Sequence, residues 1–197
     1  LVNDCTPDGS MQIVKKLISS HPRGAVVRCL EHEKNKGLSA ARNTGISVSV
    51  GDYLYFLDSD DYIPANAIEL LAEAARQKQT NFVIGNYEVT GARRWAPPLS
   101  LGTGLYEGNA LVLSNYVQEK WYVMAWNKLV SRPFVLQHQL YFQEGIVHED
   151  DLWSFKLACM AQSMYVVDET TYYYSMQPDS IMRAPSMRNL ECRVLVL

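Results

Sequence analysis

Apolar residues alternate between two patterns along the first half of the chain. Over residues 10–20 and 64–79 they recur every three or four positions, the period of an amphipathic helix, and residues 39–48 form a further helical stretch rich in small residues. Short apolar runs at residues 25–30, 52–57 and 81–89 predict strands between these helices. Because strand and helix alternate, we expect a three-layer α/β fold with a largely parallel central sheet and right-handed crossovers.

The alternation stops at residues 91–103, where Arg-Arg-Trp and Pro-Pro sequences predict a loop or flap. Beyond this loop we expect helices near residues 108–119 and at 149–161, a short element at 125–130 and a strand near 165–174. No linker divides the chain. We therefore expect one domain in two parts, residues 1–90 and 91–183, with a helical tail at residues 184–197.

Composition narrows the classes of protein that the chain can belong to. The 197 residues are 48% hydrophobic, enough for one globular domain with a core, and the formal net charge is −3. Lysine and arginine form no run longer than a pair, so nucleic acid is disfavoured as a partner. Four dispersed cysteines indicate reduced thiols, and no apolar run approaches the ~20 residues that span a bilayer. Cytoplasmic chemistry is expected, with any membrane contact peripheral.

An acidic tetrapeptide, Asp-Ser-Asp-Asp at residues 58–61, follows the strand expected at residues 52–57. Ligands of open α/β sheets bind at the carboxyl ends of the strands. A hard cation such as Mg²⁺ or Mn²⁺ takes one or two carboxylates together with substrate phosphates. The alternative is that these acids only cap the helix expected to begin at Pro64. A haloacid-type phosphatase is set aside, because the Asp-x-Asp-Gly-Thr sequence that it needs is absent.

A second acidic cluster, from His148 to Asp151, opens the helix expected at residues 149–161. Acidic side chains are favoured at the positive end of a helix, which would explain the cluster without any function. A hydroxyl nucleophile, however, needs a positioned base, and an Asp or Glu in a partly closed cleft can serve as one. These residues alone leave both interpretations open.

The order of several motifs makes the chain similar to a known family. Residues 2–10 resemble the V-D-D-G-S-x-D-x-S segment of family 2 glycosyltransferases with the GT-A fold. Residues 35–45 resemble that family's N-x-G-x-x-x-A-R-N-x-G signature, and Gly-Asp-Tyr at residues 51–53 and the acids at residues 58–61 follow it. The resemblance implies a Rossmann-like fold of the nucleotide-diphospho-sugar transferase type.

The resemblance continues into the second half of the chain. Glu-Asp-Asp at residues 149–151 follows Trp-Asn-Lys-Leu at residues 126–129, as in bacterial polysaccharide-type members, and the similarity extends to about residue 183. Ser180 and Arg183 lie where members keep a loop that closes over donor phosphates. The family also has a first strand and helix of about 30 residues, the size of a βα unit, which these residues do not include.

By this resemblance, residues 1–90 form the half that binds a nucleotide-sugar. Asp4 is similar to the family aspartate that contacts uracil or ribose, although Asn3 departs from the usual aspartate before it. Arg42 matches an arginine that stabilises the base carbonyls or the diphosphate. Asp60, with Asp58, would hold Mn²⁺ or Mg²⁺, and Asp61 would support them. The nucleotide-sugar residues implied in this way are Asp4, Asn35, Arg42, Asp58, Ser59 and Asp60.

Residues 91–183 would then form the acceptor-binding and catalytic half. Asp150 resembles the family's catalytic base, and Glu149 is the alternative base. Trp126 and Asp151 are assigned to the acceptor. For Trp126 the competing interpretation is burial in the core together with its aromatic neighbours, and for Asp151 it is a cap on the helix.

The resemblance implies an inverting, metal-dependent glycosyltransferase. It would move a hexose or N-acetylhexosamine from a UDP-sugar to a hydroxyl of a glycan or lipid-linked acceptor, in bacterial surface polysaccharide synthesis. The alternative is a domain that binds nucleotide-sugars without catalysis. The expected location is the cytoplasm, with the inner face of the membrane and a homodimer left open.

Overall fold

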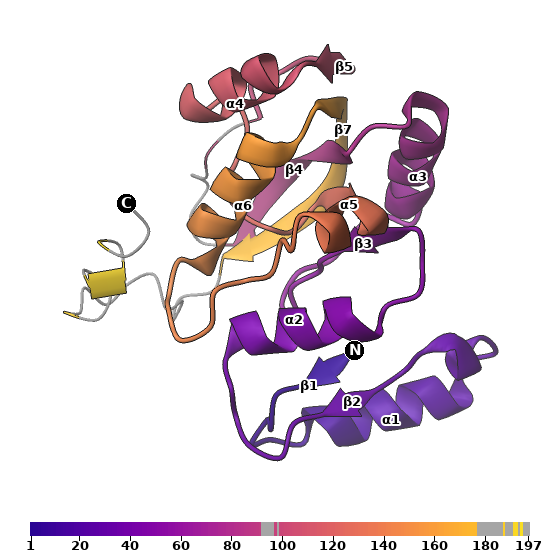
Figure 1. The fold of residues 1–197 in the computed structure, drawn as a ribbon. Helices are drawn as coiled ribbons and strands as arrows, with labels where there is room; N and C mark the ends of the chain where they lie inside the picture. The colour runs from indigo at the N-terminus through magenta and orange to yellow at the C-terminus, as the bar shows by residue number, and fades with distance from the viewer. Residues whose placement is uncertain (92–96, 98, 177–186, 188–190, 193, 195–197) are drawn as a thin grey trace.

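The computed structural model describes residues 1–91, 97, 99–176, 187, 191–192 and 194 (Figure 1). The helices are α1 (Ser10–Ser20), α2 (Leu38–Val48), α3 (Ala67–Lys78), α4 (Asn109–Val117), α5 (Arg132–Gln137) and α6 (Glu149–Met160), with a 3₁₀ turn η1 (Gly24–Val26). The strands are β1 (Val2–Asn3), β2 (Leu30–Glu31), β3 (Tyr53–Tyr55), β4 (Phe82–Gly91), β5 (Gly104–Glu107), β6 (Lys128–Ser131) and β7 (Ser163–Met176).

The central sheet has the strand order β3-β6-β4-β7-β5. Strands β4 and β7 pair in parallel over most of their length, and β3 runs in the same direction because β6 lies antiparallel to both β3 and β4. Strand β5 runs antiparallel to β7. A separate parallel pair, β1 with β2, lies beyond α2 (Figure 1). The expected α/β fold is confirmed, with β5 and β6 as its two reversed strands.

Successive residues of the central strands point to opposite faces of the sheet, and each face is covered by helices. Phe82 and Ile84 belong to the large core cluster formed with α2, α4, α5 and α6. Val83, between them, packs with Leu71 and Ala75 of α3 on the other face. Figure 1 shows α3 on one side of the sheet and α5 and α6 on the other. This alternation builds the three layers.

A buried asparagine joins three of the central strands. Asn127, just before β6, is 0% exposed, and its amide donates to the backbone carbonyls of Gly85 and Asn86 in β4. Its Oδ1 accepts from the hydroxyls of Tyr55 in β3 and Thr171 in β7. All of its side-chain hydrogen-bonding capacity is used inside the sheet, so we assign Asn127 a structural role.

Most of the expected elements are confirmed, and the differences have local causes. The strand expected at residues 25–30 is wrong: residues 24–26 form η1, and β2 holds only the two residues that the short β1 can pair. Helix α3 begins after Pro64, at Ala67. Strand β5 and helix α5 were not expected. Residue 97 and residues 99–103 lie in no helix or strand, as expected of a loop.

Some expectations fall outside the described residues. They concern residues 92–96 and 98 of the expected loop, Ser180 and Arg183, and most of the expected tail at residues 184–197. None of the described helices has both the length and the apolar character needed to cross a membrane.

Candidate functional site

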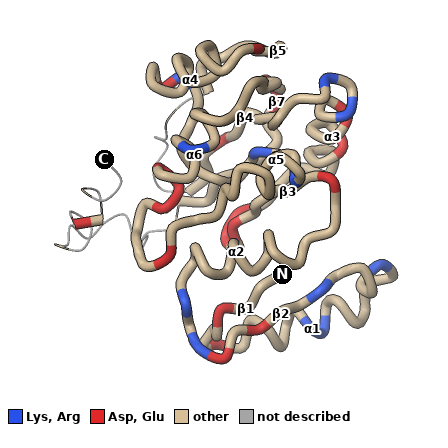
Figure 2. Tube along the Cα trace, in the orientation of Figure 1, with Lys and Arg blue, Asp and Glu red and all other residues tan. Residues whose placement is uncertain are grey.

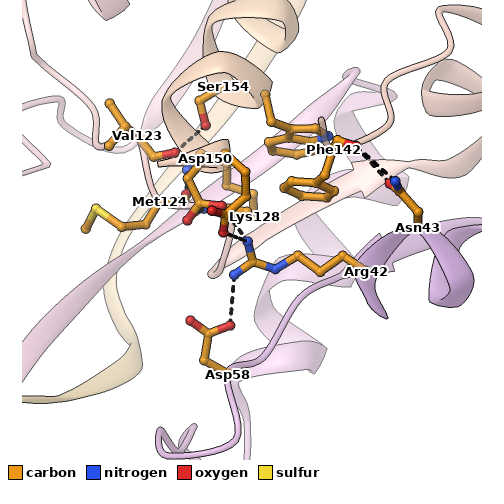
Figure 3. A network of polar contacts seen from close by, with 12 residues as sticks. Arg42, Asn43, Asp58, Val123, Met124, Lys128, Phe142, Asp150 and Ser154 are labelled. Atoms are coloured by element: carbon orange, nitrogen blue, oxygen red, sulfur yellow. Dashed lines mark hydrogen bonds and ion pairs between the residues drawn. The ribbon is translucent and has the colours of Figure 1, made fainter. Parts of the chain in front are cut away.

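Arg42 is the centre of a cluster of charged side chains that come from distant parts of the sequence. It lies on the buried face of α2, and its side chain is only 6% exposed. Nη1 donates to Glu149 at 2.9 Å and to Asp150 at 2.5 Å, and Nη2 donates to Asp58 at 3.0 Å. Figure 3 shows the guanidinium between Asp58 on one side and Asp150 on the other. The cluster thus holds three carboxylates around one cation.

Two structural features bring these carboxylates to Arg42. Asp58 follows the strand β3, at the carboxyl end of that strand, and Glu149 and Asp150 form the first turn of α6. Figure 2 shows acidic stretches at the start of α6 and after β3. One acid of the 58–61 stretch and two of the 148–151 stretch therefore meet at one arginine.

An aromatic stack supports the buried guanidinium. The Arg42 Cζ atom lies 5.0 Å from the centre of the Phe142 ring, and this ring stacks on Trp153 at 5.0 Å. Asn43 fixes the backbone of Phe142 from both sides: its Nδ2 donates to the carbonyl of Phe142 at 2.9 Å, and its Oδ1 accepts from the N–H of Phe142 at 2.8 Å. The Arg-Asn pair of the sequence signature thus places the cation and its aromatic support together.

The environment shifts the acid–base properties of the cluster. Burial works against the charge of Arg42, but the carboxylates of Asp150, Asp58 and Glu149 outweigh it and raise the pKa of the guanidinium. Burial raises the pKa of Glu149, and the neighbouring Asp150 carboxylate raises it further. The site therefore holds a permanent cation beside a carboxylate that takes up a proton more readily than usual.

Asp150 is held through both of its oxygens. Oδ1 accepts from Arg42, and Oδ2 accepts from the backbone N–H of Ala125 at 3.1 Å. A carboxylate has about four acceptor positions. The Asp150 side chain is 18% exposed, so solvent still reaches it. Asp150 is thus oriented but not enclosed.

Asp4 binds the loop that carries the Asn-x-Gly sequence. Its Oδ1 lies 2.6 Å from His32 Nδ1 and accepts from the N–H of Lys36, while Oδ2 accepts from the N–H of Gly37 at 2.7 Å. Burial would raise the pKa of Asp4, but these hydrogen bonds lower it overall. Gly37 has a φ of 90°, which favours glycine. Asn35 Nδ2 donates to the carbonyl of Asp4 and so closes the loop.

The tetrapeptide at residues 58–61 divides into inward and outward side chains. Asp61 points into the fold, where its carboxylate accepts from the Tyr172 hydroxyl at 2.6 Å and from the N–H of Ser175 at 2.7 Å. Burial raises the pKa of Asp61. Ser59 and Asp60 are exposed, and Asp60 accepts no hydrogen bond from the described residues. Asp61 therefore anchors the turn and leaves Asp60 free to meet a ligand.

A groove of about 470 Å³ runs from the β1 strand past α2 to the end of β3. Leu38, Ile46 and Leu54 form part of its apolar wall. Three residues assigned to the nucleotide-sugar, Arg42, Asp58 and Ser59, also line it. Asp4, Asn35 and Asp60 lie outside its lining.

The structure corrects the assignment of Trp126 to an acceptor. Its side chain is 2% exposed, and its ring stacks on Tyr172 at 4.4 Å and meets Tyr87 edge-on at 4.9 Å. Trp121 and Tyr122 are each 1% exposed. All three belong to the large core cluster.

The other residues near the start of α6 lie at the edge of the cluster. His148 adopts a left-handed conformation with a φ of 64° and forms the N-cap residue of α6. Asp151 lies in the first turn, and its backbone carbonyl accepts from the Tyr116 hydroxyl. Both residues are partly exposed.

The metal expected at Asp58 and Asp60 would need further ligands. Among the described residues, no three or more His, Cys, Asp and Glu side chains are grouped so that they could hold a metal ion. Asp58 already shares Oδ1 with Arg42, and Asp60 is exposed.

Three contributors to the site were not predicted from the sequence motifs. Phe142 supports the guanidinium, Asn43 holds Phe142, and the N–H of Ala125 contacts Asp150. Asn43 lies inside a recognised signature, so its presence there was a usable signal. Phe142 and Ala125 carry no polar side chain that would mark them in a sequence.

The sequence of the chain is similar to those of known proteins. The family model described as "Glycosyl transferase family 2" matches residues 1–133. The chain is 32% identical over 197 residues to "Uncharacterized glycosyltransferase EpsJ" of Bacillus subtilis (strain 168), covering 94% of this chain and 54% of that protein. It is 27% identical over 203 residues to "Glycosyltransferase GlyG" of Streptococcus pneumoniae, covering 93% of this chain and 62% of GlyG. The chain thus spans little more than half the length of these relatives.

Solved structures show the same fold. The S. aureus TarS 1-349 structure in complex with UDP-GlcNAc has a TM-score of 0.80 and 20% identity, over 99% of this chain and 55% of that one. The complex of the same protein with UDP has a TM-score of 0.74 and 22% identity, over 90% of this chain and 50% of that one.

Proposed function

The chain belongs to glycosyl transferase family 2, and from this premise we propose that it is the catalytic domain of an inverting glycosyltransferase. The reaction moves a hexose or N-acetylhexosamine from a UDP-sugar to a hydroxyl of a glycan or lipid-linked acceptor. One observation carries the proposal: Asp58 after β3 and Asp150 at the start of α6 meet at the same buried arginine. A donor site and a candidate base are thereby adjacent.

Residues 1–90 supply the donor site in this proposal. The Asp4 carboxylate accepts three hydrogen bonds from the segment between β2 and α2, so about one of its four acceptor positions is left for an N–H or hydroxyl of the nucleoside. The Asn35 side chain donates to the backbone carbonyl of Asp4 and so holds this residue in place. The fold that this chain shares with TarS, which has been solved with UDP-GlcNAc and with UDP, supports a UDP-sugar as the donor.

Arg42 contributes N–H donors to the same donor site. Three of its five N–H donors are engaged with carboxylates, which leaves two for the nucleotide. Together with Asp58 and Ser59 it lines the groove next to the exposed Asp60. We assign these four residues to the ribose and the diphosphate.

A divalent cation fits the carboxylates of this site. Mg²⁺ and Mn²⁺ are usually bound by one or two protein carboxylates together with substrate phosphates and water. Asp60, with Asp58 beside it, provides such a partial ligand set, and the remaining ligands would come from the diphosphate. When bound, the cation would neutralise charge on the departing nucleoside diphosphate.

Asp150 is the proposed base. The acceptor oxygen forms a bond to the anomeric carbon as the bond from that carbon to the diphosphate breaks, and Asp150 takes the proton of the acceptor hydroxyl. Attack from the face opposite the leaving group inverts the configuration. The N–H of Ala125 and the guanidinium of Arg42 favour the ionised carboxylate that this step requires. Glu149 is the alternative base.

The acceptor is proposed to approach over the start of α6, in the part of the chain at residues 91–183. Asp151 is the residue that we assign to it. A role in bacterial surface polysaccharide synthesis, at the cytoplasmic side, is part of the same proposal. The competing function is a nucleotide-sugar-binding domain without turnover, which the departure at Asn3 favours.

Transfer and binding can be separated by one substitution. In the full-length protein with Mn²⁺, a panel of UDP-, GDP- and dTDP-sugars is titrated by calorimetry, and donor turnover is followed by release of the nucleoside diphosphate. Asp150→Asn should abolish turnover and leave donor binding within about twofold, because the amide oxygen can still accept from Arg42 but the side chain no longer takes a proton. Glu169→Gln, an exposed acid-to-amide change, is the control and should leave both unchanged. Donor binding by a wild-type protein that never turns over would favour the binding domain.

A further inference from the structure

Lys128, the first residue of β6, is a fully buried lysine. Its Nζ donates to the backbone carbonyl of Tyr122 at 3.0 Å and to that of Met124. It also lies 4.2 Å from the centre of the Tyr122 ring. No carboxylate within the described part of the chain forms an ion pair with it. The Nζ group thus donates to the backbone of the preceding segment, residues 122–125, and burial lowers the pKa of this lysine well below its usual value.

The same segment contacts the proposed base. The N–H of Ala125 donates to Asp150 Oδ2 at 3.1 Å, and the carbonyl of Val123 accepts from the Ser154 hydroxyl. Asp150 and Ser154 are four residues apart in α6, so they lie on one face of that helix. Within this segment, Lys128 bonds to the carbonyls of Tyr122 and Met124. Helix α6 bonds to the two remaining groups, the Val123 carbonyl and the Ala125 N–H. Figure 3 shows Lys128, Met124, Val123, Ser154 and Asp150 together.

Burying a lysine without a carboxylate is unfavourable, because the amine loses its hydration. An apolar side chain of similar length would fill the same space among the aromatic rings. The contacts that only an amine provides at this position are the bonds to the two carbonyls. These bonds fix the backbone next to Ala125, whose N–H has Asp150 as its partner.

We propose that Lys128 is a positioning residue for the transfer reaction: it holds residues 122–125 so that the N–H of Ala125 orients the Asp150 carboxylate. The inference rests on the proposed function, since it takes Asp150 as the base. Lys128 acts through the Ala125 amide and not on the substrate. The charged groups that interact with Asp150 are Arg42 and Glu149, Asp58 interacts with both of these, and Lys128 itself also interacts with the Asp150 charge.

Hydrogen exchange tests the structural half of the inference without any reaction. In Lys128→Met, the Ala125 amide should exchange at least about tenfold faster than in the wild type, because its segment is no longer held. The matched control is Asn109→Ala, which removes the side chain that donates to the carbonyls of Ala158, Cys159 and Ala161 at the other end of α6. The control should leave the Ala125 amide protected. Equal protection in Lys128→Met and the wild type would overturn the inference.

Kinetics test the functional half. Lys128→Met should lower kcat about tenfold or more and change the donor KM by less than about twofold. The acidic limb of the kcat–pH profile should move to higher pH, because the carboxylate loses a hydrogen bond that favours its ionised form. Ser154→Ala, which keeps Lys128 and frees the Val123 carbonyl, should move the limb in the same direction by less. Asn109→Ala should not move it.

The outcomes separate the two proposals. If the wild type turns over and Lys128→Met has the same kcat and pH profile, the inference on Lys128 is wrong and the proposed function stands. If the wild type shows no transfer with any donor, the proposed function fails, and the exchange result alone decides whether Lys128 holds the Ala125 amide.

Discussion

The guanidinium of Arg42 lies 2.5 Å from the Asp150 carboxylate, although 108 residues separate them in the sequence. The same guanidinium binds Asp58 at 3.0 Å. One side chain of α2 therefore connects the turn after β3 with the first turn of α6. Any change that displaces Arg42 should disturb the donor side and the base together.

Arg42→Met should lower the free energy of unfolding by about 3 kcal/mol at pH 8, because three partly buried carboxylates lose their cation. Without Arg42, the three carboxylates stay close together and partly buried, so their charged forms are disfavoured in the folded state and stability falls as pH rises. The loss should therefore be smaller at pH 5 than at pH 8. Urea denaturation at the two pH values measures this difference.

Arg132→Met is the matched control for Arg42. The Arg132 Nε donates to the hydroxyl of Ser49, and this side chain forms no ion pair among the described residues. Its loss should be within about 1 kcal/mol and equal at both pH values. A pH-independent loss in Arg42→Met would contradict the proposed electrostatic role.

Glu149→Gln should gain stability relative to the wild type as pH rises. Burial and the Asp150 carboxylate raise the folded-state pKa of Glu149 above its unfolded value of about 4.3. The contribution of this acid to stability is complete below the unfolded pKa and is lost as pH rises through the folded pKa. Glutamine does not titrate, so the difference in unfolding free energy should shift in its favour between pH 4 and pH 7. Urea denaturation across this range gives the slope, and Glu169→Gln, an acid-to-amide change at an exposed position, is the reference for comparison.

Asn43→Ala should destabilise the fold by about 1–3 kcal/mol, because it leaves the N–H and the carbonyl of Phe142 without their partners. Turnover should fall as well, since the Phe142 ring supports Arg42. Gln118→Ala is the control. It removes an exposed hydrogen bond from the residue that follows α4 to Ser114 within that helix, and it should change stability by less than about 0.5 kcal/mol. Thermal denaturation and turnover assays compare the two. Similar stability losses in both variants would contradict the proposed role of Asn43 in holding the backbone of Phe142.

Gly85→Ala should destabilise the sheet by about 1–3 kcal/mol through overpacking. A Cβ atom at Gly85 would lie 1.8 Å from the Thr171 hydroxyl oxygen, where the register of β4 and β7 shifts. Gly102→Ala is the control, because a Cβ there meets nothing within 4 Å and the backbone needs no positive φ. Its stability should stay equal or rise slightly. The two melting temperatures decide between these expectations, and equal values would show that β7 can move away.

Local periodicity was sufficient for the long elements. Helices α1, α2 and α6 and strands β4 and β7 lie close to their expected positions, because each has enough residues for its apolar period to be recognised. The short elements have too few residues for an apolar period to be recognised. Strand β5 and helix α5 depend on their neighbours, and β2 has the length of its partner β1.

The sequence by itself determined the fold class, the order of the motifs and the identity of the acids, because these follow from residue types and spacing along one chain. Only the tertiary structure decided how the side chains are used. In the folded chain Trp126 is buried, and Asp61 accepts a hydrogen bond from Tyr172. Lys128 bonds to the segment that contacts Asp150. The reason is physical: a motif states which groups are available, but burial and hydrogen bonding depend on residues that are distant in the sequence and meet only when the sheet and its helices pack.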